Sequence, residues 1–195
     1  MYIRNNTVAV IFRVIFIIIC GAGLVIRVIG SGFGPDAVMK DFALVANALS
    51  LVYFAYLIIV RTDRERGVLR GAVTIYMIIT FVIYYYVNFG MSGALSEDLS
   101  LAGALLYFVS PVMVFADYLF FCRKGSFTAY SPIIWMITPV IFNLAVFIIN
   151  SVGAAVKPVP YFNLLGMNMM ITLLVFLGIS YLLFVADNLM AGRRR

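Results

Sequence analysis

The stretch PVMVFADYLFF, residues 111–121, places one carboxylate, Asp117, in an otherwise apolar and aromatic run. A carboxylate in such surroundings takes up a proton, pairs with a cation, or serves as the base in a reaction. The chain contains no histidine, so the commonest general base of enzymes is missing. What Asp117 does therefore depends on which residue neutralises it.

Two other charged residues are expected near Asp117. Arg13 interrupts the first long apolar run about six residues from its start, and Asp117 lies about five residues before the end of the fourth. Successive membrane spans run in opposite directions, so these two residues lie at similar depth. Asp187, just after the last run, lies on the same side. The sequence predicts a buried ion-pair cluster of Arg13, Asp117 and Asp187 that pins helices together, with a proton or ion relay as the alternative.

These charged residues are expected on, or at the ends of, helices that span a membrane. The chain is 65% hydrophobic and 11% charged, with a mean hydropathy of +1.10, whereas soluble domains are about half apolar and about a quarter charged. A helix crosses the hydrocarbon core with about 20 apolar residues. The sequence thus predicts one all-α membrane domain over residues 1–195, an integral membrane bundle of six transmembrane helices. These spans cover about 7–29, 42–60, 69–89, 101–122, 132–152 and 162–186.

The distribution of positive charge predicts the orientation of the bundle, because arginine and lysine favour cytoplasmic loops. With six spans, the termini and the loops on their side hold ten such residues, and the opposite loops hold only Lys40 and Lys157. Both termini are therefore predicted on the cytoplasmic side of the cell membrane. The net charge of +6 then indicates attraction to anionic membrane lipids rather than to nucleic acid. Neither a cofactor nor a metal site is predicted, because the two cysteines lack ligand spacing.

Small and polar residues fall on one face of most predicted spans. In the second run, Ala43, Asn47 and Ser50 follow one another at steps of four and three residues, which places them on one side of a helix. The same steps in the fourth run connect Gly103, Tyr107, Ser110, Val114 and Asp117. Small residues let helices approach closely and amides form hydrogen bonds between them, so the pattern predicts a packed bundle. Pro139 is predicted to kink the fifth span.

Four segments together resemble a known family. They read DFALVANALSL at 41–51, RGAVTIYMIITFVIYYY at 70–86, LLYFVSPVMVFADYLFF at 105–121 and VPYFNLLGMN at 159–168. Over nearly its full length the chain resembles the bacterial family named for its six predicted transmembrane regions. That family is similar to the animal androgen-induced and androgen-dependent integral membrane proteins. The animal proteins are intramembrane hydrolases that cleave fatty acid esters of hydroxy fatty acids with a threonine nucleophile and a histidine.

The resemblance implies a site in which both reactive residues are replaced. The threonine position holds Ala43, and the histidine position holds Tyr107, four residues before Pro111. Asn47 and Asp117 match the bacterial pattern. Alanine carries no nucleophilic oxygen, and a hydroxyl elsewhere is a poor nucleophile without an adjacent base. The resemblance therefore implies a vestigial pocket lined by Ala43, Asn47, Tyr107 and Ser110, without catalytic residues.

Three functions remain open on the sequence alone. The first is a multi-pass membrane protein without hydrolase activity that takes a fatty-acyl ligand in the vestigial pocket. The second is an intramembrane lipid esterase with a non-standard nucleophile, for which Thr74, Thr80 and Ser110 are the hydroxyl candidates. The third is a small transporter. The predicted pairing also carries a consequence for stability, because Arg13→Leu should leave Asp117 unpaired.

Overall fold

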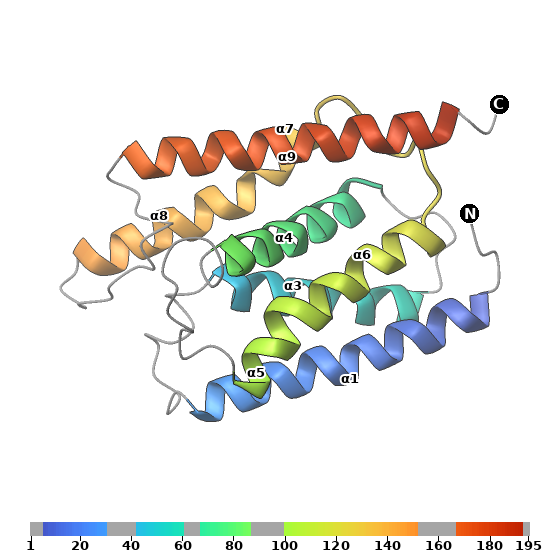
Figure 1. Ribbon diagram of the computed structural model, residues 1–195, viewed down its shortest axis with the longest axis horizontal. Helices are drawn as coiled ribbons and strands as arrows, with labels where there is room; N and C mark the ends of the chain where they lie inside the picture. Colours follow the sequence, from blue (N-terminus) through green and yellow to red (C-terminus); the bar gives the residue numbers. More distant parts are fainter. Residues whose placement is uncertain (1–5, 31–41, 61–66, 87–99, 152–166, 193–195) are drawn as a thin grey trace.

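The computed structural model describes residues 6–30, 42–60, 67–86, 100–151 and 167–192, and every element in these ranges is helical. Figure 1 shows the arrangement. In chain order the elements are α1 (Asn6–Gly30), α3 (Phe42–Val60), α4 (Gly67–Tyr86), α5 (Leu101–Gly103), η3 (Ala104–Val109), α6 (Ser110–Phe121), α7 (Ser131–Trp135), α8 (Ile137–Ser151) and α9 (Met167–Gly192). The all-α prediction is confirmed for these residues.

Four of the helical segments are long and apolar enough to cross a membrane. They are Asn6–Gly30, Phe42–Val60, Leu101–Phe121 and Leu173–Gly192. The third and fifth predicted spans correspond to shorter apolar helices, Gly67–Val82 and Ser131–Ala145. The membrane character inferred from composition thus has a counterpart in helices of the required length.

The end of the last helix differs from the prediction. The expected span, 162–186, stops before Asp187, whereas α9 continues to Gly192 and places Asp187 inside the helix with no exposed surface. The charge of Asp187 lowers the local hydropathy, but hydrogen bonds to buried partners (described below) let this carboxylate lie in the core. The start of the predicted span, 162–166, lies outside the described residues.

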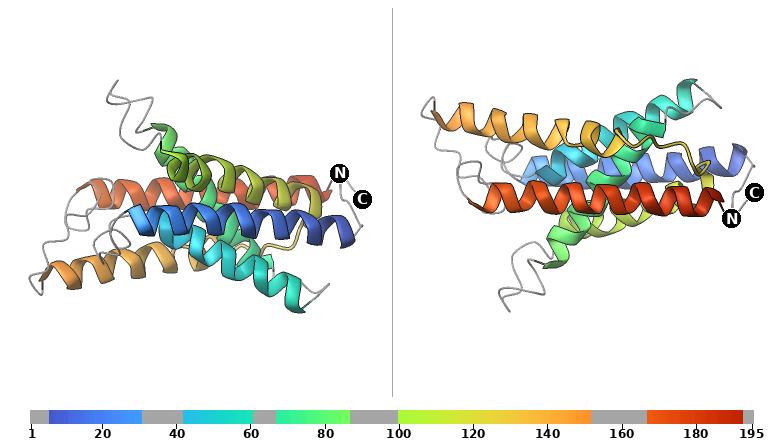
Figure 2. Two further views of the ribbon diagram at one scale, coloured as in Figure 1. Left: turned by 90° about the horizontal axis from the view of Figure 1, so that it is seen from below. Right: turned by 90° about the horizontal axis from the view of Figure 1, so that it is seen from above.

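The helices α1, α8 and α9 lie roughly lengthwise, whereas α3 and α4 are inclined to them (Figure 2). At one end of the bundle α1 begins and α9 ends, α3 ends, α4 begins and α6 ends (Figure 1). We call it the Asn6 end, and the opposite end, where α1 finishes, the Gly30 end. Residues near the end of α6 can therefore meet residues near the start of α1 and α4.

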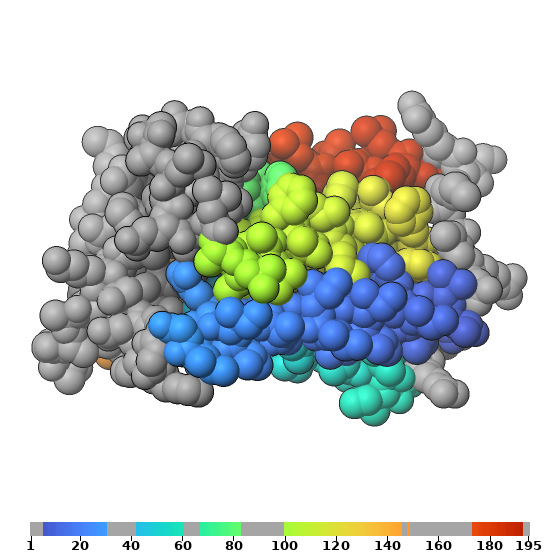
Figure 3. Space-filling view, turned by 60° about the horizontal axis from the view of Figure 1, so that its bottom comes forward, coloured from blue at the N-terminus to red at the C-terminus, as the bar shows by residue number. Residues whose placement is uncertain are grey.

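One face of α1 faces the rest of the bundle. Its buried residues are Ala9, Arg13, Phe16, Cys20 and Gly23, at alternating steps of four and three. Figure 3 shows α1 lying along the α5–η3–α6 segment. A Cβ atom on Gly23 would stand 2.9 Å from a Leu106 methyl carbon, so the glycine is what allows this close approach.

The predicted kink at Pro139 appears as a break between α7 and α8 at Met136. Proline has no N–H group, so the Trp135 carbonyl oxygen, four residues earlier, receives no backbone hydrogen bond from it. The Tyr76 hydroxyl donates to this oxygen at 2.8 Å. The Trp135 ring is fully buried and packs on Gly71, and its Nε1 donates to the Val68 carbonyl oxygen at 2.7 Å. These contacts join the broken fifth segment to α4.

Candidate functional site

A charged centre surrounds Asp117 near the Asn6 end. Arg13 Nε donates to Asp117 Oδ1 at 3.1 Å, and Arg70 Nη2 donates to the other oxygen, Oδ2. The three side chains come from α1, α4 and α6, and their exposed fractions are 7%, 2% and 1%. The contact expected between Arg13 and Asp117 is thus present. Each carboxylate oxygen accepts a charge-assisted hydrogen bond, which holds three helices at one point.

Arg70 was missed as a member of this centre. In the sequence it stands close to Arg61, Arg64 and Arg66, and it was counted with them as loop charge. It lies in the first turn of α4, where four residues separate it from Thr74, another buried polar residue. That helical spacing is the signal that could have placed it on the inward face. Because Arg70 also binds Asp117, the prediction that Arg13→Leu leaves the carboxylate unpaired is wrong.

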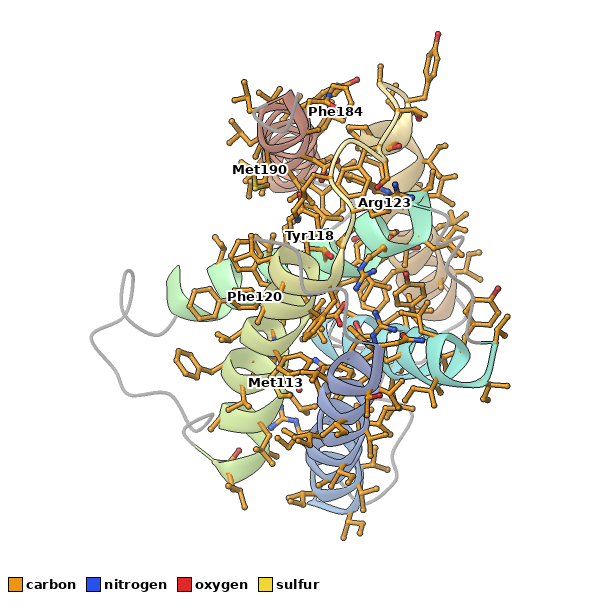
Figure 4. All side chains as sticks on the ribbon, turned by 90° about the vertical axis from the view of Figure 1, so that its right-hand side faces the viewer. Met113, Tyr118, Phe120, Arg123, Phe184 and Met190 are labelled. Carbon is orange, nitrogen blue, oxygen red and sulfur yellow. The ribbon has the colours of Figure 1, made fainter. Side chains whose placement is uncertain are left out.

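Asp187 forms a second polar contact at the same end, with different partners. The Tyr118 hydroxyl donates to Asp187 Oδ1 at 2.8 Å, and the backbone N–H groups of Gly125 and Ser126 donate to Oδ2 at 2.7 and 3.2 Å. Gly125 has a φ of +79°, a left-handed conformation that favours glycine. In Figure 4, which looks onto this end, Tyr118 lies between α6 and α9. Asp187 therefore docks the segment after α6 onto α9.

The Lys124 side chain lies over the ring of Tyr118. Its Nζ donates to the Tyr118 carbonyl oxygen at 2.7 Å and stands 3.1 Å from the centre of the phenol ring. A cation over an aromatic face is attracted by the ring electrons. The sequence grouped Asp187 with Arg13 and Asp117. The structure brings it to the residue next to Asp117 along α6 and fixes it through Tyr118 and the following loop.

A neutral centre lies further toward the Gly30 end, around Asn47. Its Nδ2 donates to the Ala43 carbonyl oxygen at 2.8 Å and to the Leu106 carbonyl oxygen at 3.0 Å. The Cys20 thiol donates to Asn47 Oδ1 at 3.4 Å. Both amide hydrogens and the amide oxygen are thus engaged, and Asn47 has no exposed surface. An amide used in this way joins α1, α3 and η3.

The predicted pocket residues do come together in this region, and all of them are buried. Ala43 and Tyr107 pack in one apolar cluster with Leu44 and Leu106, at 7% exposure or less. Ser110 is buried beside the Cys20 thiol. Side chains, with Tyr107 among them, thus occupy the place that the sequence predicted as a pocket.

The buried hydroxyl groups proposed as nucleophiles either donate to a backbone carbonyl oxygen or have no base beside them. Thr74 and Thr80 each donate to the carbonyl oxygen four residues earlier, at 2.8 and 2.9 Å. Ser110 is seven residues from Asp117 on the same helix, a rise of roughly 10 Å, with Val114 buried between them. Proton transfer needs direct contact or one bridging water. None of these three hydroxyls is therefore paired with a base.

An apolar layer separates the two centres. Between Arg13 and Cys20 on α1 lies Phe16, whose ring centre is 4.5 Å from that of Phe54 on α3, and Val114 occupies the matching place on α6. These three residues are at most 2% exposed. A chain of titratable groups from one centre to the other, which a proton relay requires, is not formed by these residues.

Comparisons of the chain with family models, curated proteins and solved structures find no match. Within the described ranges, no group of three or more histidine, cysteine, aspartate or glutamate side chains is placed to hold a metal ion. The two centres are therefore the features from which the function of the chain is inferred.

Proposed function

We propose that this chain is a six-span integral membrane protein of the cell membrane, with both termini cytoplasmic, that does not hydrolyse lipid esters. In this proposal its polar interior binds one helix to another. The four long apolar helices support membrane insertion. The shorter helices within 67–82 and 131–145 supply the remaining two crossings. Arg123, which is exposed just after α6 at the Asn6 end, agrees with a cytoplasmic position for that end.

The observation that carries the proposal is the use of the Asn47 carboxamide. An ester hydrolase needs a nucleophile, a base and donors for the oxyanion that forms. At the positions where the resemblance expects threonine and histidine stand Ala43 and Tyr107, and both Asn47 hydrogens are bound to backbone carbonyl oxygens. The carboxylate of Asp117 is bound by two guanidinium groups. At these described positions the groups that such a reaction would use are either replaced or engaged in packing.

The partners in this proposal are membrane lipids. Large apolar side chains are exposed along the outward faces of the helices, among them Ile18, Val52 and Leu182 at 64%, 65% and 69%. Such faces match acyl chains. A fatty-acyl ligand inside the bundle would have to displace Tyr107 from its cluster with Ala43, Leu44 and Leu106.

Purified protein in lipid nanodiscs, incubated with fatty acid esters of hydroxy fatty acids, tests the proposal directly. We expect no release of free fatty acid and no labelling by a fluorophosphonate probe. Turnover that is lost on Thr74→Ala, Thr80→Ala or Ser110→Ala would overturn the proposal and favour the esterase alternative. Liposome ion flux that Asp117→Asn abolishes would also overturn it, in favour of transport. A photoreactive fatty acid tests the ligand separately, through cross-links to Tyr107 or its neighbours.

A further inference from the structure

The backbone of η3 is held in an unusual register. This segment, Ala104–Val109, is a π-helix, in which an N–H group bonds to the carbonyl oxygen five residues earlier. The Ser110 N–H donates to the Leu105 oxygen in this way. The next donor in the series would belong to residue 111, but that residue is proline and has no N–H. The Leu106 carbonyl oxygen therefore receives no hydrogen bond from the backbone position that the register assigns to it.

Asn47 supplies the missing donor from another helix. Its Nδ2 lies 3.0 Å from the Leu106 oxygen, and the amide is fully buried. An unsatisfied carbonyl in an apolar interior is costly, so this hydrogen bond stabilises the π register. A similar arrangement occurs at Pro139, where the Tyr76 hydroxyl donates to the Trp135 oxygen that this proline leaves without a donor. Two prolines in this chain are thus each matched by one side-chain donor from a neighbouring helix.

The state of Ser110 shows which group competes for the Leu106 oxygen. Three other buried hydroxyls, those of Ser50, Thr74 and Thr80, donate to the carbonyl oxygen four residues earlier in their own helices. For Ser110 that acceptor is Leu106, which Asn47 already binds, and the buried Ser110 side chain lies beside the Cys20 thiol instead. The Ser110 N–H, which now donates to the Leu105 oxygen, is the backbone donor that reaches the Leu106 oxygen in an α register.

We propose that Asn47 is a register lock for η3, and that loss of its hydrogen bond converts Ala104–Val109 from π-helix to α-helix. In the α register the Ser110 N–H bonds to Leu106 instead of Leu105, and the segment before it rotates by about one residue, roughly 100°. Pro111 then leaves the Tyr107 carbonyl oxygen, four residues earlier, without a backbone donor. Tyr107 then leaves its position beside Ala43 and Leu44. Asn47 thereby determines whether Tyr107 fills the space between α3 and η3.

A double-mutant cycle on Asn47 and Pro111 tests this. The melting temperature is measured with a thiol-reactive fluorogenic coumarin, since Cys20 and Cys122 are both buried and react on unfolding. Pro111→Ala restores an N–H group that can donate to the Leu106 oxygen. We expect Asn47→Leu to lower the melting temperature in the parent, and to lower it by less than half as much in the Pro111→Ala background. Equal losses in the two backgrounds would overturn the proposal.

The cycle needs a control and a second reading. Cys20→Ala, read through Cys122, gives the effect of losing only the thiol hydrogen bond to Asn47, and we expect no dependence on Pro111. If Asn47→Leu yields no folded protein, folded yield on size exclusion replaces the melting temperature: recovery by Pro111→Ala supports the lock, and failure to recover contradicts it.

The change of register is read by fluorine NMR of 3-fluorotyrosine at position 107, with a label at position 118 as control. We expect Asn47→Leu to shift the signal at 107 and the signal at 118 to stay in place. An unchanged signal at 107 in folded Asn47→Leu protein would contradict the proposed change.

Discussion

The two polar centres of the bundle solve the same problem in different ways. At the Asn6 end, the charge of Asp117 is met by the charges of Arg13 and Arg70. Closer to the Gly30 end, the neutral Asn47 meets a backbone carbonyl that Pro111 leaves without a donor. Phe16 and its neighbours separate the two.

The difference concerns what each centre costs when it is broken. Removal of one member of the charged centre leaves an ion in an apolar interior, whereas removal of the neutral donor leaves one dipole unsatisfied. In both centres, every described hydrogen bond either joins two helices or joins a side chain to the backbone of its own helix. This teaches that polarity inside a membrane bundle need not mark a reaction.

The largest effect is expected at Asp117. Asp117→Leu leaves two guanidinium groups in the interior without their shared carboxylate and should reduce the free energy of unfolding by about 3–5 kcal/mol. Arg13→Leu should cost less, because Arg70 still binds the carboxylate. Thermal unfolding in detergent, followed by the reaction of Cys20 and Cys122 with the coumarin reagent, ranks the two variants. An equal loss would mean that Arg70 contributes nothing to the centre.

The second contact at the Asn6 end should be weaker. Asp187→Asn removes the charge that accepts from Tyr118, Gly125 and Ser126 and replaces one acceptor oxygen with a donor. We expect a loss of about 1.5–3 kcal/mol, the range for hydrogen bonds to a charged group. Limited proteolysis of the segment between α6 and α7 should become faster while the melting of the rest stays cooperative. Unchanged cleavage would show that Asp187 does not hold this segment.

The smallest effect is expected where one neutral donor is lost. Tyr76→Phe removes the hydroxyl that binds the Trp135 oxygen and should cost about 1–3 kcal/mol, because that carbonyl remains buried and unsatisfied. In a Pro139→Ala background the restored backbone N–H can donate to the same oxygen, so the cost of Tyr76→Phe should fall. Unfolding of the four combinations gives the coupling. If the losses in the free energy of unfolding simply add, the Tyr76 hydroxyl does not compensate for the donor that Pro139 lacks.

Features that depend on the types and spacing of side chains along one helix were predictable from the sequence. The helical segments follow from apolar runs, and the Arg13–Asp117 contact follows from their equal depth in antiparallel spans. Arg70 was missed because arginine near a helix end is read as loop charge unless its helical face is considered. The helix α9 continues past the end of the predicted span, where hydropathy falls at Asp187, and hydrogen bonds to Tyr118 and the following loop hold this charge inside.

The partner of Asn47 could not be read from the sequence. Its acceptor is a backbone carbonyl, which every residue carries, and the π register of η3 leaves no pattern in side-chain types. Pro111 was the one visible sign, since a proline inside a span always leaves a carbonyl to be satisfied. Which side chain donates a hydrogen bond to that carbonyl depends on how α3 packs against η3.

The claim that buried charge in this protein serves packing is tested most directly by neutralising the whole charged centre at once. The triple variant Arg13→Leu, Arg70→Leu and Asp117→Leu removes the three described ions together, and replacement of a buried ion group by apolar residues is often neutral or stabilising. Unfolding in detergent should therefore show the triple variant within about 1 kcal/mol of the parent, well above Asp117→Leu alone. A triple variant as unstable as Asp117→Leu would contradict this account.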